Sequence, residues 1–408
     1  MIPLETSALS GLGRLEARGD RVTGVQVDSR RISPGDLFVA VGRGATFTDD
    51  ALARGAAATL VPDDAFAALA LIGLAVRERS GARVVGITGS TGKTSTKDIL
   101  DALCKPSRRT VAAEASFNNE IGVPLTLCRL EQDTEVCIVE LGMRGLGQIA
   151  HLCAIARPEI GVITNVGPVH LELVETIEGV VRAKGELVDS LPSGGVAIVP
   201  EGFPVARHDL EVVRVPPDPE STVVDGRAVV DGVAFNFTAR HQMANAVAAL
   251  AAARALGLPA PPSVAVDFAP WRGDELELAG GGLLVNDAYN ANPISMRAAL
   301  EYLAEVAGDR RKVAILGDMA ELGRTGARYH REIGVAAAQL GVDELLAVGA
   351  LAAGYLDGGV PGRSVPNVHE ALRALDEVVR EGDAVLVKAS RVVGLEAVAE
   401  ALAKVPAA

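Results

Sequence analysis

A glycine-rich segment at residues 86–94 is the clearest sign of chemistry in this chain. It reads G-I-T-G-S-T-G-K-T and lies between an apolar run and a segment with helical patterning. Glycines let backbone N–H groups wrap around phosphate oxygens, and a helix N-terminus adds positive potential. Lys93 would neutralise the β- and γ-phosphates, and the Thr94 hydroxyl would bind Mg²⁺. Because Gly86 lies one position too early for the usual spacing, the sequence predicts a variant nucleotide-binding loop.

Three more polar residues follow this loop at positions where ligands are often bound. Glu140 ends a strand expected over residues 136–140, and a carboxylate at the carboxyl edge of a parallel sheet is costly unless paired or coordinated. His170 lies six residues after a strand expected at 160–164, and Lys184 lies on an expected helix. A single histidine is more often a structural hydrogen-bonding group and a helical lysine is usually solvated. Only Glu140 therefore indicates a site by itself.

Alternating strands and helices must position these residues. Buried strands are expected at 83–88, 136–140 and 160–164, with helical segments between them, which is typical of a parallel sheet with helices on both faces. Residues 212–237 instead favour short antiparallel strands with turns at two Asp-Gly pairs, and an alanine-rich helix is expected over 242–256.

The flanking regions predict two further domains. Ahead of the loop, strands are expected at 24–27 and 36–41 and an apolar helix at 65–76; residues 256–262 read as a linker. A second α/β series follows, with strands at 283–286, 313–316, 344–348 and 384–387 and helices from 293, near 329–340 and at the end. The expected fold is α/β with three domains: a small N-terminal α/β domain (1–82), a central phosphate-loop domain with a parallel sheet (83–270) and a Rossmann-like C-terminal domain (271–408).

Composition excludes several classes of function. The 408 residues are 49% hydrophobic, and the formal net charge of -13 argues against general affinity for nucleic acid or anionic membranes. An anionic substrate would therefore need locally concentrated positive charge. No secretory signal is visible, and the longest uncharged apolar stretch is too short to span a bilayer. The four cysteines form no C-x-x-C pair, so we expect core thiols in a reducing cytoplasm and a cytoplasmic protein.

Several motifs together resemble the Mur ligase superfamily, whose phosphate loop commonly reads T-G-[ST]-x-G-K-[ST]. The further matches are D-S-R at 28–30, N-N-E-I-G-V-P at 118–124, N-D-A-Y-N-A-N-P-I-S-M at 286–296 and L-G-D-M-A-E-L-G at 316–323. They cover all three expected domains. The Y-N-A-N-P run most resembles the member that joins D-alanyl-D-alanine to a UDP-N-acetylmuramoyl-tripeptide through an acyl phosphate.

The resemblance implies ATP and Mg²⁺ as cofactors and assigns residues to them. Lys93, Lys184 and His170 would be catalytic, with Lys184 carbamylated by CO₂ to give an oxygen donor. Asn245 would read adenine, while Arg272 would contact phosphate and Asp287 ribose. The phosphates would lie on Gly89, Ser90, Thr91, Gly92, Lys93, Thr94 and Ser95, and the metal on Thr94, Glu140, His170 and Lys184.

The resemblance also implies contacts to the other two substrates. A hydroxyl and a guanidinium at Ser29 and Arg30 could hold the uridine diphosphate, although a solvated turn is an alternative. Amides at Asn118 and Asn119 suit a peptide, although they could equally cap a loop. Further substrate contacts are expected at Asn290 and Asn292, and the dipeptide carboxylate is expected at Lys388, Ser390 and Arg391.

The chain departs from the family pattern at Ala239, Gln242 and Ala389, and reads T-D-D at 48–50 where the family has D-G-H. The last change concerns how the nucleotide-sugar is held. Two other functions stay open: a related amide ligase that adds diaminopimelate, lysine or glutamate, and a nucleotide-binding subunit without ligase activity. A monomer is expected, with no nucleic-acid partner and no membrane insertion.

Overall fold

The computed structural model describes residues 1–404, which divide into two compact units. The first unit contains Met1–Asn165, Arg182–Phe237 and Met243–Asp267, and the second contains Val166–Val181, Thr238–Gln242 and the described chain from Phe268 onward. Among the described residues, no helix has the length and apolar character needed to cross a membrane.

The N-terminal part of the first unit is built on a four-stranded sheet with the order β2-β6-β5-β4. Its core contains Phe38, Ala51 and Leu52. The predicted strands here are one to two residues shorter in the structure, and the predicted apolar helix is α2. The elements are β1 (Leu4–Glu5), β2 (Gly13–Ala17), β3 (Arg21–Val22), β4 (Gly24–Gln26), β5 (Asp36–Val39), α1 (Thr48–Ala53), β6 (Ala58–Pro62) and α2 (Ala65–Arg77).

The central part carries the predicted parallel sheet, with the order β12-β11-β10-β7-β9-β8 and parallel pairing throughout. The strands are β7 (Arg83–Thr88), β8 (Thr110–Ala112), β9 (Val136–Glu140), β10 (Ile160–Ile163), β11 (Val196–Pro200) and β12 (Glu211–Val215). The helices are α3 (Lys93–Cys104), α4 (Gly122–Leu127), α5 (Gln148–Ala156), α6 (Leu171–Val174) and α7 (Ile177–Asp189). All carboxyl ends of this sheet lie at one edge, the edge where ligands bind in such folds.

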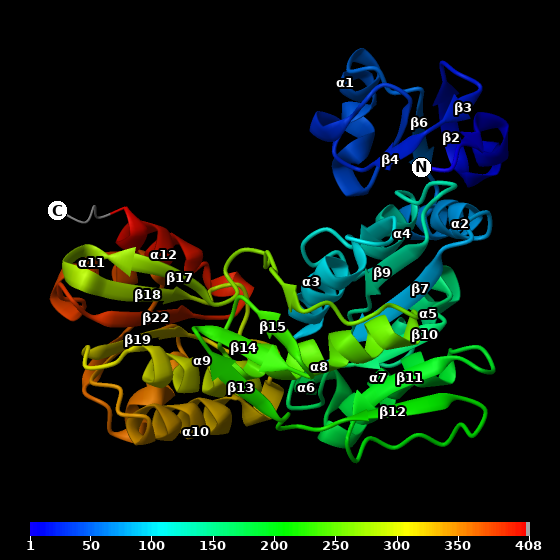
Figure 1. The fold of residues 1–408 in the computed structure, drawn as a ribbon. Helices are drawn as coiled ribbons and strands as arrows, with labels where there is room; N and C mark the ends of the chain where they lie inside the picture. Colours follow the sequence, from blue (N-terminus) through cyan, green and yellow to red (C-terminus); the bar gives the residue numbers. More distant parts are fainter. Residues whose placement is uncertain (405–408) are drawn as a thin grey trace. The chain divides into compact units, whose positions relative to one another are not determined.

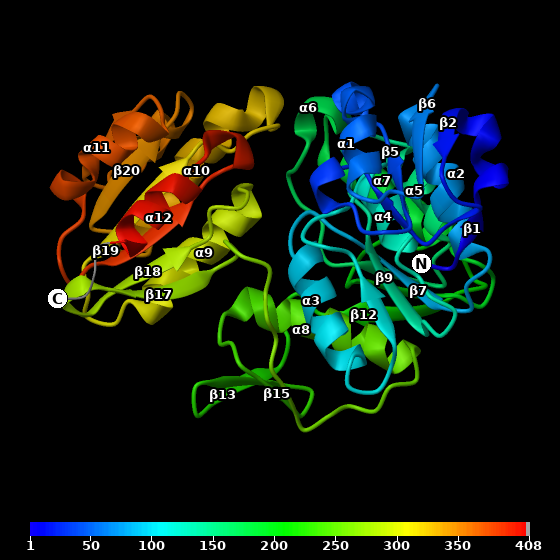
Figure 2. The same ribbon diagram turned by 90° about the horizontal axis from the view of Figure 1, so that it is seen from above.

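One predicted region needs correction. Residues 212–215 were expected in an antiparallel group, but they form β12, which extends the central sheet in parallel beside β11. The antiparallel group is limited to β13 (Ser221–Val224), β14 (Arg227–Val230) and β15 (Val233–Phe235), drawn in Figure 2. Both Asp-Gly pairs are confirmed as turns, because aspartate and glycine have positive φ in each.

The alanine-rich helix is α8 (Arg240–Ala255), and the predicted linker follows it. After this linker the chain first returns to the antiparallel group, since β16 (Ser263–Val264) pairs with β15 in parallel. From Phe268 onward the described chain belongs to the second unit.

The second unit contains a six-stranded sheet with the order β17-β18-β22-β19-β20-β21. Helices α9 and α10 lie on one face of it and α11 and α12 on the other (Figure 1). In this sheet, as far as the structure describes it, β17 is the strand that runs antiparallel to its neighbour. The sequence-based prediction did not include β17, β21 or α11. The elements are β17 (Asp274–Leu278), β18 (Gly282–Asn286), α9 (Pro293–Val306), β19 (Lys312–Gly317), α10 (Gly326–Gln339), β20 (Glu344–Val348), β21 (Gly362–Val365), α11 (Val368–Val378), β22 (Ala384–Lys388) and α12 (Glu396–Ala403).

Candidate nucleotide and metal site

The phosphate loop joins β7 to α3 and turns at two glycines. Gly89 and Gly92 have φ values of 155° and 79°, which residues with a Cβ rarely adopt. A Cβ at Gly89 would also collide with the Thr164 hydroxyl, and one at Gly92 with the Asn245 amide. Glycine is therefore required where the backbone passes close to its neighbours. The structure places Asn245, the residue predicted to read adenine, directly against this loop.

The loop is held from the end of β10 by two residues that sequence reasoning did not assign to the site. The Asn165 side chain accepts the Thr91 N–H at 2.9 Å and donates to the Thr91 hydroxyl at 2.7 Å. The Asn165 carbonyl accepts the Ser90 N–H at 3.1 Å, and the Thr164 hydroxyl donates to the Thr91 carbonyl. Their position in the sequence could have indicated a role in the site, because both directly follow a buried parallel strand.

Lys93 and Thr94 begin α3 and face the inside of the site. The Lys93 ammonium donates to the Gly89 carbonyl at 2.7 Å, across the mouth of the loop. The Thr94 hydroxyl donates to Oε2 of Glu140 at 3.2 Å, and both residues are buried, with Glu140 0% exposed. The structure thus brings the loop and the carboxyl end of β9 together.

This group fits a magnesium ion. Mg²⁺ prefers oxygen ligands and keeps most of its sites for water and substrate phosphates, so it needs only one or two protein groups. The hydroxyl of Thr94 and the carboxylate of Glu140 are such groups. Among residues 1–404, no cluster of three or more His, Cys, Asp or Glu side chains could hold a metal alone. Two oxygen donors from the protein suit a metal whose other positions are filled by water and phosphate oxygens.

Lys184 is a buried lysine of the first unit. It lies on α7 and is only 1% exposed. Burial lowers the pKa of its ammonium well below 10.5, and the nearby positive charge of Lys93 lowers it further. No hydrogen bond or ion pair of this side chain is found within the described chain. Burial and the charge of Lys93 both shift the equilibrium toward the neutral amine, which is the nucleophilic form, relative to an exposed lysine.

His170 lies in the second unit, unlike the other predicted metal residues. It has a left-handed φ of 54° and caps the short helix α6. Its Nδ1 contacts Oε2 of Glu321, a residue from the loop between β19 and α10. The structure therefore brings Lys93, Thr94 and Glu140 together in one unit and His170 together with Glu321 in the other. Sequence reasoning gave Glu321 no role.

The carboxyl ends of β18 and β22 place two predicted ligands against each other. The Lys388 ammonium contacts Oδ2 of Asp287 at 2.5 Å and the Asn290 carbonyl at 2.9 Å, and its side chain is 2% exposed. The Ser390 hydroxyl donates to the Ala291 carbonyl at 3.3 Å. Lys388 is thus turned inward, toward the loop that contains Asp287.

The other two predicted cations of this region lie against aromatic rings. The guanidinium of Arg272 lies 4.0 Å from the ring centre of Tyr289. That of Arg391 lies 4.7 Å from the ring centre of Trp271 and forms an ion pair with Glu396 at 3.3 Å. The Arg391 side chain is about half exposed, so it can reach a ligand without breaking a buried pair.

Several residues predicted to contact substrate form local hydrogen bonds. The Asn292 side chain caps α9, and the Asn290 side chain accepts the Ala291 N–H at 2.9 Å. The Asn119 side chain accepts the backbone N–H groups of Ile121 and Gly122 at the start of α4, as expected if it caps this loop. Asn118 lies so close to Gly142 that a Cβ at Gly142 would collide with it.

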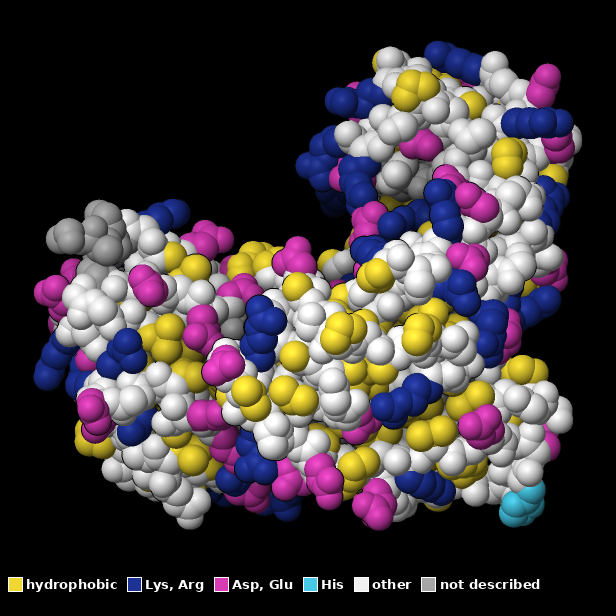
Figure 3. Space-filling view, viewed as in Figure 1, with side chains coloured by type: hydrophobic (Ala, Val, Ile, Leu, Met, Phe, Trp, Pro, Cys, Tyr) yellow, Lys and Arg dark blue, Asp and Glu magenta, His cyan; other side chains and the backbone are white. Residues whose placement is uncertain are grey.

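In the N-terminal part, the polar turn at residues 28–30 is also internally paired. Arg30 forms a forked ion pair with Asp28, and a hydrogen bond from Ser29 lowers the pKa of Asp50. Asp50 belongs to the T-D-D segment at the position of the family's D-G-H, so this segment accepts the hydrogen bond of the Ser29 hydroxyl. Residues 1–82 contain no lysine, and on the face drawn in Figure 3 the arginine side chains of this part lie among acidic ones.

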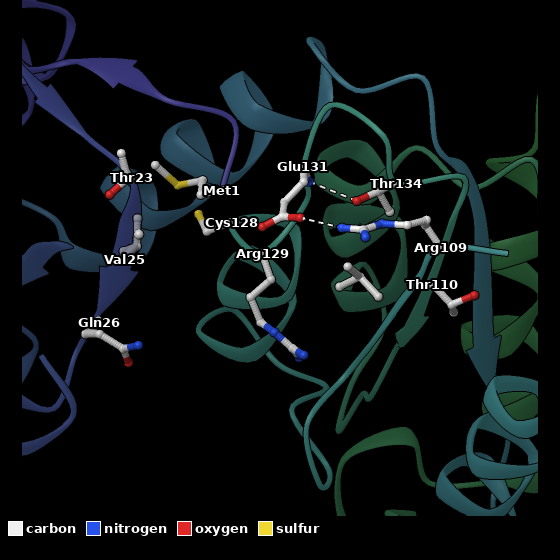
Figure 4. Close-up of a pocket in the computed structure, with 12 residues that line it drawn as sticks. Met1, Thr23, Val25, Gln26, Arg109, Thr110, Cys128, Arg129, Glu131 and Thr134 are labelled. Carbon is white, nitrogen blue, oxygen red and sulfur yellow. Dashed lines mark hydrogen bonds and ion pairs between the residues drawn. The ribbon is translucent and has the colours of Figure 1, made fainter. Parts of the chain in front are cut away.

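A separate cavity of about 430 Å³ lies between β4 and the start of β8 (Figure 4). None of the predicted site residues line it. Arg109 on its wall is already paired with Glu131 at 2.9 Å. The cavity therefore belongs to the junction of two sheet edges and not to the nucleotide site.

Comparison with known proteins identifies two family models and a set of full-length relatives. Residues 87–218 match the Mur ligase middle domain and residues 273–391 match the Mur ligase, glutamate ligase domain. The chain is 31% identical to the UDP-N-acetylmuramoyl-tripeptide–D-alanyl-D-alanine ligase of Bacillus subtilis, with 94% of each chain covered. It is 32% identical to the enzyme of the same name from Escherichia coli, with 98% of this chain and 99% of the relative covered.

Solved structures agree with the sequence matches. A crystal structure of MurF from Acinetobacter baumannii has a TM-score of 0.86 and 27% identity, covering 98% of this chain and 99% of the other. The MurF ligase from Thermotoga maritima in complex with ADP has a TM-score of 0.79 and 26% identity, covering 93% and 97%. The predicted three-domain α/β fold is confirmed by these matches.

Proposed function

This chain belongs to the Mur ligase family, and we propose that it joins D-alanyl-D-alanine to UDP-N-acetylmuramoyl-tripeptide with conversion of ATP to ADP and phosphate. As a Mur ligase it is an ATP-dependent amide ligase. The observation that supports this substrate pair is the match to ligases of that name over nearly the whole length of both chains. The product would serve the synthesis of peptidoglycan precursors.

The reaction begins with binding of the ATP tail by the phosphate loop. Backbone N–H groups at the end of the loop and in the first turn of α3 bind phosphate oxygens, and Lys93 neutralises the charge that moves toward the leaving ADP. The tripeptide's terminal carboxylate attacks the γ-phosphorus, giving an acyl phosphate. The dipeptide amine then attacks the acyl carbon, loses a proton, and phosphate leaves with the electron pair of the broken C–O bond. ATP is required because a carboxylate is a poor electrophile.

Thr94 and Glu140 are the groups of the first unit that would hold magnesium, which would neutralise phosphate charge when bound. His170 and Lys184 complete the proposed ligand set. The burial and lowered pKa of Lys184 support carbamylation, since a neutral amine can add to CO₂ and the resulting carbamate provides oxygen ligands.

The remaining contacts follow the chemistry of the described groups. Ser29 and Arg30 hold the uridine diphosphate part, and Asn118, Asn119, Asn290 and Asn292 border the peptide. Asn245 reads adenine, while Arg272 and Asp287 contact phosphate and ribose. Of the two cations proposed for the dipeptide carboxylate, Arg391 is the exposed one, whereas Lys388 supports Asp287. We place the domain boundaries near residues 82 and 270 and propose that the protein acts as a cytoplasmic monomer.

The test is ADP release with UDP-N-acetylmuramoyl-tripeptide and a panel of acceptors. D-alanyl-D-alanine should support release, and D-alanine, diaminopimelate, lysine and glutamate should not. Release with one of the single amino acids would identify a different amide ligase of the family. If no acceptor supports release while ATP still binds, the protein is a nucleotide-binding subunit.

A further inference from the structure

The segment Val166–Val181 interrupts the central part of the chain. It begins directly after β10 and ends inside α7, yet it belongs to the second unit. Its contacts with that unit include that of His170, whose Nδ1 meets Oε2 of Glu321, and that of the Glu172 N–H, which donates to the Glu321 carbonyl at 3.3 Å. Glu321 therefore contacts this segment with both its side chain and its backbone.

Glu321 lies in a loop that is held firmly from several sides. The N–H of Met319 donates to His330 at 3.0 Å, and that of Ala320 donates to Ser390 at 2.8 Å. Two residues after Glu321, a Cβ on Gly323 would lie 3.3 Å from the Cα of Glu172, so the two segments are close there as well. This support gives the carboxylate of Glu321 a defined position.

Both members of the contact have an unusual backbone conformation. His170 has a φ of 54° and Glu321 a φ of 62°, in the left-handed region that residues with a Cβ rarely adopt. Strained residues of this kind cluster at functional sites, where the surrounding structure holds them.

We propose that Glu321 is a positioning residue, which holds the His170 ring so that Nδ1 carries the proton and Nε2 keeps a free lone pair for the metal. Metal-binding histidines commonly donate their other N–H to a carboxylate, which fixes both the tautomer and the ring orientation. The contact to Nδ1 leaves Nε2 as the available nitrogen. This role rests on the proposed function of His170 as a magnesium ligand.

The first measurement is independent of activity. In protein labelled with ¹⁵N-histidine, long-range ¹H–¹⁵N spectra should show His170 as the Nδ1–H tautomer, and Glu321→Ala should convert it to a tautomer mixture. With ADP present, Mn²⁺ titration followed by electron paramagnetic resonance should show affinity reduced by about 10-fold to 100-fold in this variant. The Mn²⁺ affinity of Glu321→Gln, which keeps an oxygen acceptor, should lie between those of wild type and Glu321→Ala.

The matched control is Glu172→Ala, which removes an exposed carboxylate from the contacting segment and should leave spectrum and affinity unchanged. Glu321→Ala should lose ADP release, and in the His170→Ala background it should cause no additional loss. The proposal is wrong if the His170 signals and the Mn²⁺ affinity of both Glu321 variants match wild type. It is also wrong if the losses of ADP release caused by Glu321→Ala and His170→Ala add in the double variant. If Glu321→Ala melts early, the spectrum of Glu321→Gln decides. Wild-type protein without ligase activity would refute the proposed function and leave the tautomer test intact.

Discussion

Each of the two units contains a buried lysine near residues of the proposed site, Lys184 in the first and Lys388 in the second, and the two have different surroundings. Lys388 at the end of β22 has a carboxylate, Asp287, at 2.5 Å and the Asn290 carbonyl at 2.9 Å. Lys184 on α7 has no carboxylate partner within the described residues, and its pKa is lowered by burial and by Lys93. The Lys388 ammonium is thus paired with a carboxylate, whereas burial favours the neutral form of Lys184.

This difference separates structural support from a reactive position. A buried ion pair with additional hydrogen bonds holds a loop in place, and removing one partner leaves the other charge without compensation. Burial of an amine without a carboxylate partner lowers its pKa and so favours the neutral, nucleophilic form. The C-terminal sheet edge therefore presents a preformed loop, whereas the central part presents the buried amine that we propose is carbamylated.

The largest effect is expected from Lys184→Ala. Loss of the proposed metal-binding carbamate should lower ADP release by about 100-fold or more. Formate or acetate should restore part of the rate by filling the space with a carboxylate. Lys105→Ala, which removes an exposed lysine paired with Asp101 at 2.6 Å, serves as the control. A normal rate in Lys184→Ala would remove this residue from the site.

Lys388→Met should lower the free energy of unfolding by about 3 kcal/mol, because Asp287 would be left without its counter-charge. Urea denaturation measures this loss. The double variant Lys388→Met/Asp287→Asn should recover part of it, since both charges are then removed. An equal loss in the single and double variants would mean that the pair is not the source.

Lys184→Met should change stability in the opposite direction. In buffer free of CO₂ and bicarbonate, replacing a desolvated amine by an apolar side chain of similar length should stabilise the protein by about 1 kcal/mol. The same urea experiment measures it beside Lys388→Met. Destabilisation of similar size in both variants would contradict the contrast between the two lysines.

A smaller, pH-dependent effect is expected at His330. Its Nε2 accepts the Met319 N–H and its Nδ1 donates to the Gly326 carbonyl, which requires a neutral ring, and burial lowers its pKa below 6.5. The unfolded chain then binds the proton first, so stability is full above about pH 6.5 and falls below it, down to the lowered folded-state pKa. The slope from this residue is at most about 1.4 kcal/mol per pH unit.

Melting temperatures between pH 5 and 8 test this prediction. His330→Gln should reduce the loss of stability in acid, and the remaining slope should include His241, whose pKa is also lowered by burial. An unchanged pH profile in His330→Gln would show that this ring is not the titrating group.

The sequence determined those features that depend on neighbouring residues. The phosphate loop was predictable because its glycines supply backbone conformations that other residues avoid, and Lys93 and Thr94 follow at a fixed spacing. The Asp-Gly turns and the strand–helix alternation were predictable for the same local reason.

The tertiary structure decided which distant residues meet. The place of β12 in the parallel sheet depended on its pairing with β11, and a short apolar run carries no information about its partner. Asn165 supports a loop 74 positions earlier in the chain, and His170 meets Glu321 across 151 positions. Such pairs depend on the order of strands in a sheet and on where the loops fold back, and neither is set by the spacing of residues along the chain.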